Sequence, residues 1–185
     1  VDPGLVKSVR GVAYCTRVSP ALANRVVTAA RTHLNTLVAD VKIATDASSR
    51  RNSAGVPGFG VVLVAETTTD RKIAVDLDAA WALPEGDKSP ETLGENAALV
   101  LAGEIAKAGI ADTPNQALLL TIMALGPDEA NVAVLPGPLS DAAVLRLRLL
   151  YTFLGVKFKL DQLEGGSVRC TCQGRGFTNV AKPVT

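Results

Sequence analysis

Apolar residues in the first eighty positions recur with two spacings, which predict strands around one helix. Residues 9–18 are rich in valine, as strands are. After Ser19-Pro20, a helix cap followed by a first-turn proline, apolar side chains return every three or four residues to about residue 37. Shorter apolar runs predict further strands at residues 41–45, 59–66 and 73–77. The pattern therefore predicts a β-α-β-β-β unit.

The second half of the chain carries longer helical patterns. Helices are predicted from Ser89-Pro90 to Gly109, from Thr113-Pro114 to Leu125 and from Ser140 to Gly155. The last helix is expected to be buried on most sides, because it contains Val144, Leu145, Leu147, Leu149 and Leu150. Strands are predicted at residues 132–135, 156–160 and 168–172, the last two joined by a Gly165-Gly166 turn. The predicted fold class is α+β, in two layers with helices on one face of each sheet.

The stretch 52–66 begins as a glycine-rich loop and ends as an apolar strand. The loop lacks the Lys-Ser/Thr of a P-loop and precedes a strand rather than a helix, which favours a surface turn over a phosphate site. Val62 and Val64 alternate with Val61 and Leu63, so both faces of the strand are apolar. We therefore expect a central strand that is nearly covered on both sides.

Composition places the chain among globular proteins. Hydrophobic residues make up 48% and charged residues 20% of the 185 positions. The longest strongly apolar run, residues 117–126, is about half the length that a membrane-spanning helix needs, so we expect no membrane association. Three cysteines, Cys15, Cys170 and Cys172, are interpreted as small buried hydrophobes rather than as a zinc site, since a single distant histidine accompanies them.

Charge is spread unevenly along the chain. The net charge is +5 over residues 1–60, −8 over residues 61–135 and +4 over residues 136–185. Two basic ends around an acidic middle are compatible with separate faces for RNA and for a protein partner, and also with ordinary solvated surface.

Few residues suit catalysis or metal binding. His33, the only histidine, lies on the first predicted helix and is expected to be partly exposed rather than a general base. Asp76 and Asp78 share one face of a predicted strand and come nearest to a carboxylate cluster, although a solvated strand edge explains them equally. No cofactor and no metal are expected.

Five segments together resemble the RNA 3′-terminal phosphate cyclase family, and more narrowly its cyclase-like, nucleolar branch. They are RGVAYCTRVSPALANRVV, VPGFGVVLVAETT, TPNQALLLTIMALGPDEA, LPGPLS and GFTNVAKPVT. The resemblance runs in order over nearly the whole chain and corresponds to the C-terminal half of such a protein. It implies that residues 8–80 form the family's inserted small α/β domain, residues 88–175 the last repeat of its large domain, and residues 176–185 a tail.

The resemblance also implies that the cyclase chemistry is lost. Active cyclases use a histidine as the nucleophile on ATP, and alignment on Gly137-Pro138 places that position at Ala142. An Asp-Gln pair of active members falls at Ala117-Leu118. Apolar residues at these two positions suit a helix that is buried for packing alone.

The function implied by the resemblance is that of a non-catalytic ribosome-assembly factor. Such proteins belong to the small-subunit processome in the nucleolus of the nucleus, support early pre-rRNA cleavages, and work with a ribosome-assembly GTPase, pre-rRNA and snoRNP components. The alternative is an endoribonuclease that cleaves pre-rRNA, for which Asp141 and Arg148 are the only candidate pair. A helix-capping carboxylate and a surface arginine explain this pair more simply.

Four basic residues near the C-terminus are the candidates for nucleic-acid contact. Arg148 matches an arginine of the family branch, and Arg146, Lys157 and Lys159 lie near it in the sequence. Lys157 and Lys159 are expected on one face of a strand, opposite Phe158, where positive charge also protects a sheet edge from aggregation. Arg10, Arg17 and Arg25 are the alternative candidates.

We expect no covalent protein–AMP adduct when the chain is incubated with labelled ATP and a divalent metal, because the methyl group of Ala142 cannot attack phosphorus. Restoring the nucleophile with Ala142→His should also fail, since the Asp-Gln pair is still missing. Denaturing electrophoresis with radiolabel detection provides the measurement. An acid-labile labelled band on the unmodified chain would contradict the loss of cyclase chemistry.

Overall fold

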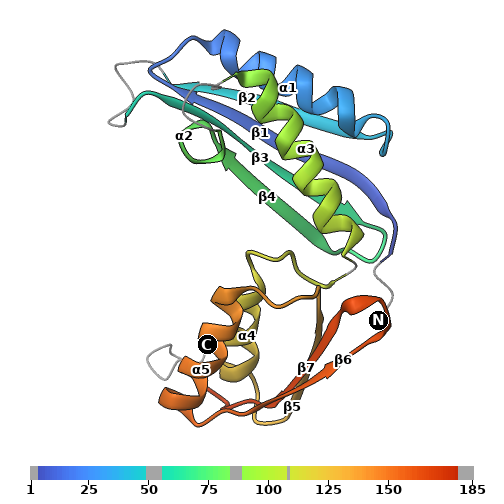
Figure 1. Ribbon diagram of the computed structural model, residues 1–185, viewed down its shortest axis with the longest axis vertical. Helices are drawn as coiled ribbons and strands as arrows, with labels where there is room; N and C mark the ends of the chain where they lie inside the picture. Colours follow the sequence, from blue (N-terminus) through green and yellow to red (C-terminus); the bar gives the residue numbers. More distant parts are fainter. Residues whose placement is uncertain (1–3, 49–55, 84–88, 108, 179–185) are drawn as a thin grey trace, which may run out of the picture. The chain divides into compact units, whose positions relative to one another are not determined.

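The computed structural model describes residues 4–48, 56–83, 89–107 and 109–178, and the chain divides into two compact units, residues 2–106 and residues 107–185. Each unit has a β-sheet with helices packed on it, so the predicted α+β class is confirmed (Figure 1).

The first unit is a four-stranded mixed sheet in the order β2-β1-β3-β4. Strands β1 and β2 are parallel and joined through α1, whereas β3 pairs antiparallel with β1 and with β4. The elements are β1 (Val6–Thr16), α1 (Pro20–Leu34), β2 (Val41–Ser48), β3 (Gly58–Thr67), β4 (Lys72–Asp78), α2 (Ala79–Ala82) and α3 (Pro90–Ala106).

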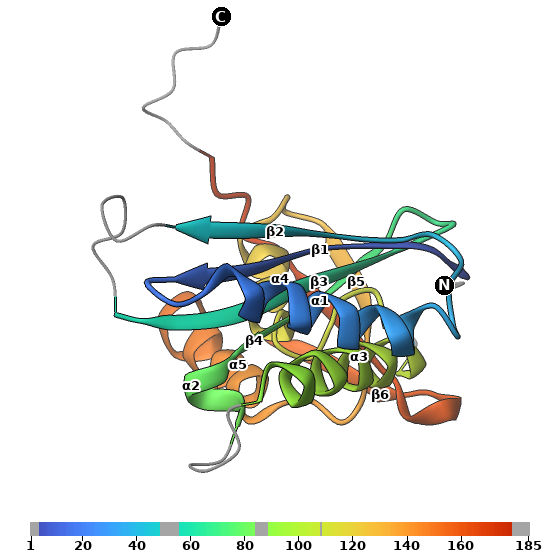
Figure 2. The ribbon, with the colours of Figure 1, turned by 90° about the horizontal axis from the view of Figure 1, so that it is seen from above.

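Helix α1 begins and is oriented as its sequence predicts. The Ser19 side chain accepts a hydrogen bond from the Ala21 amide at 3.3 Å, and Pro20 follows it at the first helical position. Side chains at helical spacing then point into the core, namely Ala23, Val26, Ala30 and Leu34. Seen from above, α1 and α3 lie on the same side of the sheet (Figure 2).

Helix α3 belongs to the first unit, which corrects the predicted domain boundary. The domain limits expected from the sequence assign this helix to the second domain, residues 88–175. In the structure α3 packs on α1, β3 and β4, and the division into units falls after Ala106. An amphipathic pattern states that a helix buries one face, but not which sheet it covers.

The contact between α1 and α3 is close enough to involve backbone atoms. A Cβ atom on Gly94 would lie 2.4 Å from the carbonyl oxygen of Val26 and 2.9 Å from the Ala29 Cβ. Only glycine therefore allows the two helices to approach this closely. Around this point the buried α3 residues Leu93, Ala97 and Leu101 join the core.

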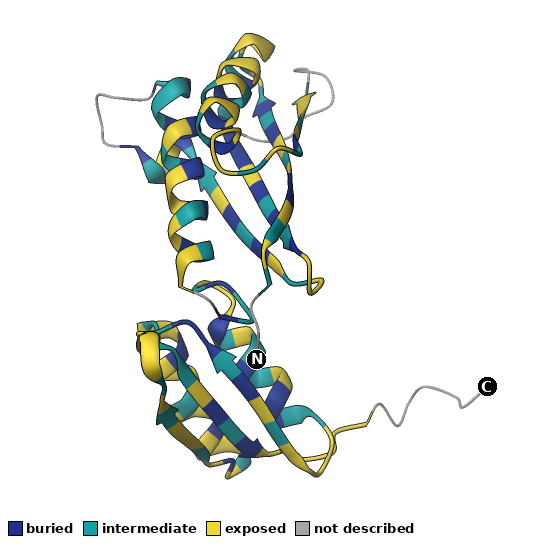
Figure 3. Cartoon of the chain, turned by 90° about the vertical axis from the view of Figure 1, so that its right-hand side faces the viewer, coloured by how far each residue is buried: buried dark blue, intermediate teal, exposed yellow. Residues whose placement is uncertain are grey.

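Strand β3 is central, as predicted, but only one of its faces is buried. Val61, Leu63 and Ala65 are fully buried beneath the helices, while Val62 is 36% exposed and Val64 is half-buried. The alternation is visible along the strands in Figure 3. The expectation that β3 is nearly covered on both sides is wrong, because both long helices of this unit pack on the same face. The upstream part of the glycine-rich loop, residues 52–55, lies outside the described residues; Gly58 and Gly60 are part of β3.

Asp78 ends β4 and starts α2, a short helix that the sequence patterns missed. Its carboxylate accepts a hydrogen bond from the Ala80 amide at 2.7 Å and caps α2. The Tyr14 hydroxyl donates to the same carboxylate at 3.4 Å, and the Tyr14 ring lies across Gly60, where a Cβ would overlap it. Asp78 therefore caps α2. It ends β4, which is an edge strand of the sheet, and Asp76 on the same strand is exposed, so the interpretation of these carboxylates as a strand edge is confirmed.

The second unit is a three-stranded antiparallel sheet in the order β5-β7-β6, with a core shared between α4, α5 and the sheet. Core residues include Leu120, Leu135, Leu150 and the two thiols Cys170 and Cys172. Its elements are α4 (Gln116–Leu125), β5 (Ala130–Leu135), α5 (Asp141–Leu154), β6 (Phe158–Gln162), a 3₁₀ turn (Glu164–Gly166) and β7 (Val168–Gln173).

Helix α5 starts and ends where predicted but is less buried than expected. Ser140 caps its first turn by accepting from the Ala143 amide, and Gly155 ends it in the left-handed conformation. Only Ala143 and Leu150 are buried, whereas Leu145 is 56% exposed. The predicted burial on most sides is wrong, because α5 packs within its unit through the single face that carries these two residues.

Two identical substitutions in α3 should shift stability in opposite directions. Gly94→Ala places a methyl group against the α1 backbone and should lower the free energy of unfolding by about 1–3 kcal/mol. Gly103→Ala meets no atom within 4 Å at an exposed helical position and should raise it by up to about 1 kcal/mol. Urea unfolding followed by circular dichroism measures both. Equal effects of the two variants would contradict the close helix approach.

Candidate nucleic-acid interface

The alternative basic candidates of the first unit are largely engaged with carboxylates. Arg10 donates to the carboxylate and to the carbonyl of Asp40, and this contact lowers the pKa of the Asp40 carboxyl. Arg25 forms a two-point contact with Glu91, with N–O distances of 2.6 and 2.8 Å. Arg17 follows β1 and is exposed. Of these three arginines, Arg10 and Arg25 therefore have much of their charge neutralised.

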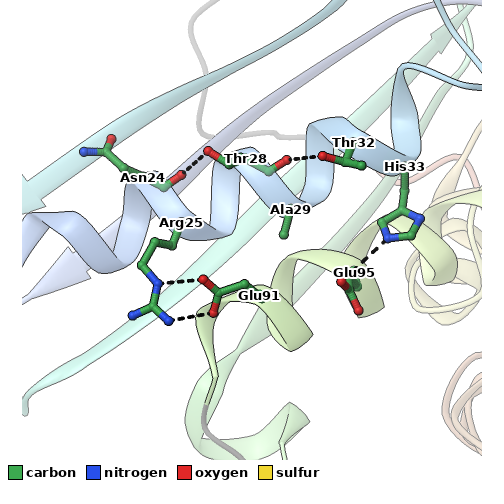
Figure 4. Close-up of a pocket in the computed structure, with 8 residues that line it drawn as sticks. All are labelled: Asn24, Arg25, Thr28, Ala29, Thr32, His33, Glu91 and Glu95. Atoms are coloured by element: carbon green, nitrogen blue, oxygen red, sulfur yellow. Dashed lines mark hydrogen bonds and ion pairs between the residues drawn. The ribbon is translucent and has the colours of Figure 1, made fainter.

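A shallow groove of about 320 Å³ runs between α1 and α3 (Figure 4). Helix α1 contributes Asn24, Arg25, Thr28, Ala29, Thr32 and His33, and α3 contributes Glu91 and Glu95. The hydroxyls of Thr28 and Thr32 donate to carbonyls of their own helix, so their hydrogen atoms are already used within α1. The groove is lined by two facing pairs, Arg25 with Glu91 and His33 with Glu95, rather than by a concentration of positive charge.

The stronger of these pairs holds Glu91 in its charged form. The Arg25 guanidinium, helped by the Glu91 backbone amide and by the Ser89 hydroxyl, lowers the pKa of Glu91 to about 2. At the other end of the groove, His33 Nε2 lies 3.9 Å from Glu95 Oε1, and the imidazole is 44% exposed. The expectation that His33 is a partly exposed surface residue is confirmed.

The structure brings only two of the four predicted C-terminal basic residues to one place. Arg148, on α5, and Lys157, just before β6, line the same pocket of about 420 Å³. Lys157 Nζ lies 5.8 Å from the centre of the Tyr151 ring. Arg146 is exposed elsewhere on α5, and Lys159 pairs with Asp161 at 3.2 Å.

The expected common strand face for Lys157 and Lys159 is not found. Strand β6 begins at Phe158, so Lys157 lies before the strand and contacts the α5 aromatic ring. Lys159 is inside the strand, opposite Thr171 of β7. Whether any of the four predicted residues binds nucleic acid stays a prediction.

Asp141 and Arg148 are separated along α5. Asp141 is the first residue of the helix and Arg148 lies seven positions later, about 10 Å along the axis. Both side chains are exposed, and none of the contacts between described residues joins them. The pair therefore does not form a preassembled acid–base site.

The positions that the sequence resemblance assigns to the cyclase chemistry are exposed or half-buried. Ala142 is exposed on α5, and Leu118 is 57% exposed on α4, while Ala117 is half-buried. The expectation that these apolar residues belong to a buried helix surface is wrong. Neither alanine nor leucine carries a group that can act as a nucleophile or hold a nucleotide phosphate.

Gln116 is a buried polar residue that sequence reasoning missed. It is fully buried at the start of α4, donates to the Pro136 carbonyl at 2.7 Å, and accepts from the Ser140 amide at 2.8 Å. These bonds fix the loop between β5 and α5. The helical spacing that places Leu120 and Met123 inward also places Gln116 inward, so the signal was present in the sequence.

The remaining candidates show no assembled site. Cys15, Cys170 and Cys172 are free and buried, which confirms their interpretation as small hydrophobes, and burial raises the pKa of the Cys170 thiol to about 11. Among the described residues no group of three or more His, Cys, Asp or Glu side chains is placed to hold a metal ion. Within the same residues no helix has the length and apolar character needed to cross a bilayer.

Sequence comparison relates the first unit to one known domain. Residues 1–106 match the profile described as "RNA 3'-terminal phosphate cyclase (RTC), insert domain". The end of the match coincides with the end of the first unit, so the profile independently includes α3 in this domain.

Curated relatives match over nearly the whole chain. The "RNA 3'-terminal phosphate cyclase-like protein" of Bos taurus is 42% identical over 98% of this chain and 50% of its own length. The "rRNA processing protein rcl1" of Schizosaccharomyces pombe is 34% identical over 98% and 49%, and the "rRNA processing protein RCL1" of Saccharomyces cerevisiae is 29% identical over 100% and 50%. The chain spans about half the length of these relatives.

The stabilisation by Glu91 should disappear in acid. Because its folded pKa, about 2, is below the ordinary value of 4.5, the contribution is complete above about pH 5 and is lost as pH falls toward 2. Parent and Glu91→Gln should therefore differ in urea midpoint at pH 7, and the difference should shrink below pH 5 and vanish as the pH falls through about 2. In an Arg25→Gln background, Glu91→Gln should change little. A pH-independent difference between parent and Glu91→Gln would contradict the assigned ion pair.

Proposed function

Because this chain belongs to the RNA 3′-terminal phosphate cyclase family, we propose that it acts in the processing of ribosomal RNA precursors without cyclase activity. In this proposal the protein is an assembly factor of the small-subunit processome in the nucleolus, a pseudoenzyme required for early cleavages that release small-subunit rRNA. Its partners are a ribosome-assembly GTPase, pre-rRNA and snoRNP components.

The similarity to two yeast proteins named for rRNA processing carries this proposal. Both align with essentially all of this chain, across the two units. Because they are about twice as long as the chain, the activity and partners of the whole protein are part of the proposal rather than a property read from these residues.

The absence of cyclase chemistry is supported by the residues at the aligned positions. An exposed methyl group, that of Ala142, stands where active cyclases carry their histidine, and the exposed Leu118 takes the position of the paired glutamine. A reaction through a covalent adenylate needs a nucleophile that can be deprotonated, which neither side chain offers.

A non-catalytic role is favoured over the endoribonuclease alternative by the layout of α5. Cleavage of RNA needs a base, an acid and a group that stabilises the pentavalent phosphate, all within reach of one bond. Asp141 and Arg148 lie two helical turns apart, and none of the contacts between described residues joins them to a further acid or base.

Cells depleted of the protein provide the test. Depletion should cause uncleaved precursors of small-subunit rRNA to accumulate, and expression of the parent protein or of Asp141→Asn should restore cleavage. Northern analysis of precursors measures the outcome. Normal precursor levels after depletion would overturn the role in rRNA processing.

A reconstituted cleavage reaction separates the assembly role from nuclease activity. At saturating protein, Asp141→Asn and Arg148→Gln should change the rate of the cleavage step by less than tenfold, with Arg146→Gln as the matched control on the same helix. A fall of two or more orders of magnitude, with folding and RNA binding intact, would instead assign catalysis to this protein.

A further inference from the structure

The pocket that contains Arg148 and Lys157 combines aliphatic, aromatic and positively charged side chains. It lies between the C-terminal half of α5 and the beginning of β6. Its volume of about 420 Å³ is within the range of about 300–1,000 Å³ typical of ligand pockets. It is lined by Leu147, Arg148, Tyr151, Val156, Lys157, Phe158 and Leu160.

The apolar part of the pocket offers a flat aromatic surface beside an aliphatic floor. Tyr151 is 55% exposed, although its neighbours Leu150 and Val156 are buried. Phe158 is half-buried and packs against the core of the second unit. Lys157 Nζ lies over the Tyr151 ring, 5.8 Å from its centre. When this ammonium group contacts a phosphate instead, the exposed ring beside the apolar side chains is a surface on which an unpaired nucleobase stacks.

The charged part of the pocket is uniformly positive. Arg148 and Lys157 are both exposed, and no acidic side chain is among the lining residues. Within the described part of the chain, neither cation has a carboxylate partner, in contrast to Arg10, Arg25 and Lys159. Two cations at the rim of an apolar pocket provide the charge that a phosphate on either side of a stacked base requires.

We propose that this pocket binds a nucleotide of single-stranded RNA, with the base stacked on Tyr151 and the flanking phosphates contacted by Arg148 and Lys157. The proposal rests on the proposed role in rRNA processing and specifies where the RNA is held. Single-stranded RNA fits because bases in a duplex are already stacked on one another and their faces are inaccessible. An apolar protein segment would fill the floor but leave both cations without a counter-charge.

Fluorescence anisotropy with the purified 185-residue chain and labelled ten-nucleotide RNAs tests the pocket. Single-stranded RNA should bind more tightly than a duplex of the same length. Tyr151→Ala should weaken binding of the single strand about tenfold or more, whereas Tyr151→Phe keeps the ring and should stay within about threefold. Phe153→Ala, which removes a 78% exposed ring from the same helix outside the pocket, should have no effect.

A ligand without bases separates stacking from charge. An abasic oligonucleotide of equal length should bind parent and Tyr151→Ala equally, while Arg148→Gln and Lys157→Gln should weaken binding of both ligands and flatten its salt dependence. Equal binding of single-stranded RNA by parent and Tyr151→Ala would overturn the proposal. Preference for the duplex would also count against it. So would binding of an apolar peptide that does not displace the single-stranded RNA.

The two proposals can fail separately. If Tyr151→Ala binds RNA as the parent does while depletion of the protein still blocks pre-rRNA cleavage, the pocket is wrong and the role in rRNA processing stands. If depletion leaves cleavage normal but the Tyr151 dependence of RNA binding is present, the pocket stands and its RNA has another origin.

Discussion

The backbone contact between α1 and α3 at Gly94 determines how the first unit is assembled. A side chain at this position would meet the Val26 carbonyl oxygen at 2.4 Å, so the two helices can lie against each other only at a residue without a Cβ. Their close approach lets both helices cover the same face of one sheet and buries Leu93 and Leu101 against β3 and β4. It also places Glu91 within two-point reach of Arg25. The same contact accounts for the inclusion of α3 in this unit. It also accounts for the exposure of the sheet face opposite the two helices.

Local pattern predicted most elements correctly, and its errors about burial and domain limits have one physical origin. Periodicity identifies which side of an element is apolar but does not say what covers it. For that reason α3 was assigned to the wrong unit, and the valines on the outer side of β3 were expected to be covered. β-Branched residues also suit exposed strand positions, since Val62 packs beside Val12 on the neighbouring strand without any helix above it. The exposed leucines of α5 led to the same kind of error, because their apolar character was taken to mean that they are covered.

The candidate interface was predictable in residue type but not in arrangement. A count of basic residues treats Arg25 and Arg148 alike, yet the first is neutralised by a carboxylate 66 positions away and the second has no such partner among the described residues. That distinction exists only in three dimensions. Tyr151 was overlooked although it follows Arg148 by three positions, a spacing that places both on one side of a helix. Arginines that look alike in the composition are therefore distinguished by whether a carboxylate pairs with them in the structure.

The central place of β1 in its sheet has a consequence for folding kinetics. β1 is the first strand of its unit in the sequence, but one of its neighbours, β3, comes some fifty residues later, and the helix that closes the core, α3, later still. Contacts between distant parts of a chain form slowly, because a large loop must close before they stabilise anything. During synthesis, β1, α1 and β2 therefore emerge before the edge of β1 that pairs with β3 has its partner. Until β3 has been synthesised, this edge is open to pairing with another chain, and unpaired strand edges make folding intermediates prone to aggregate.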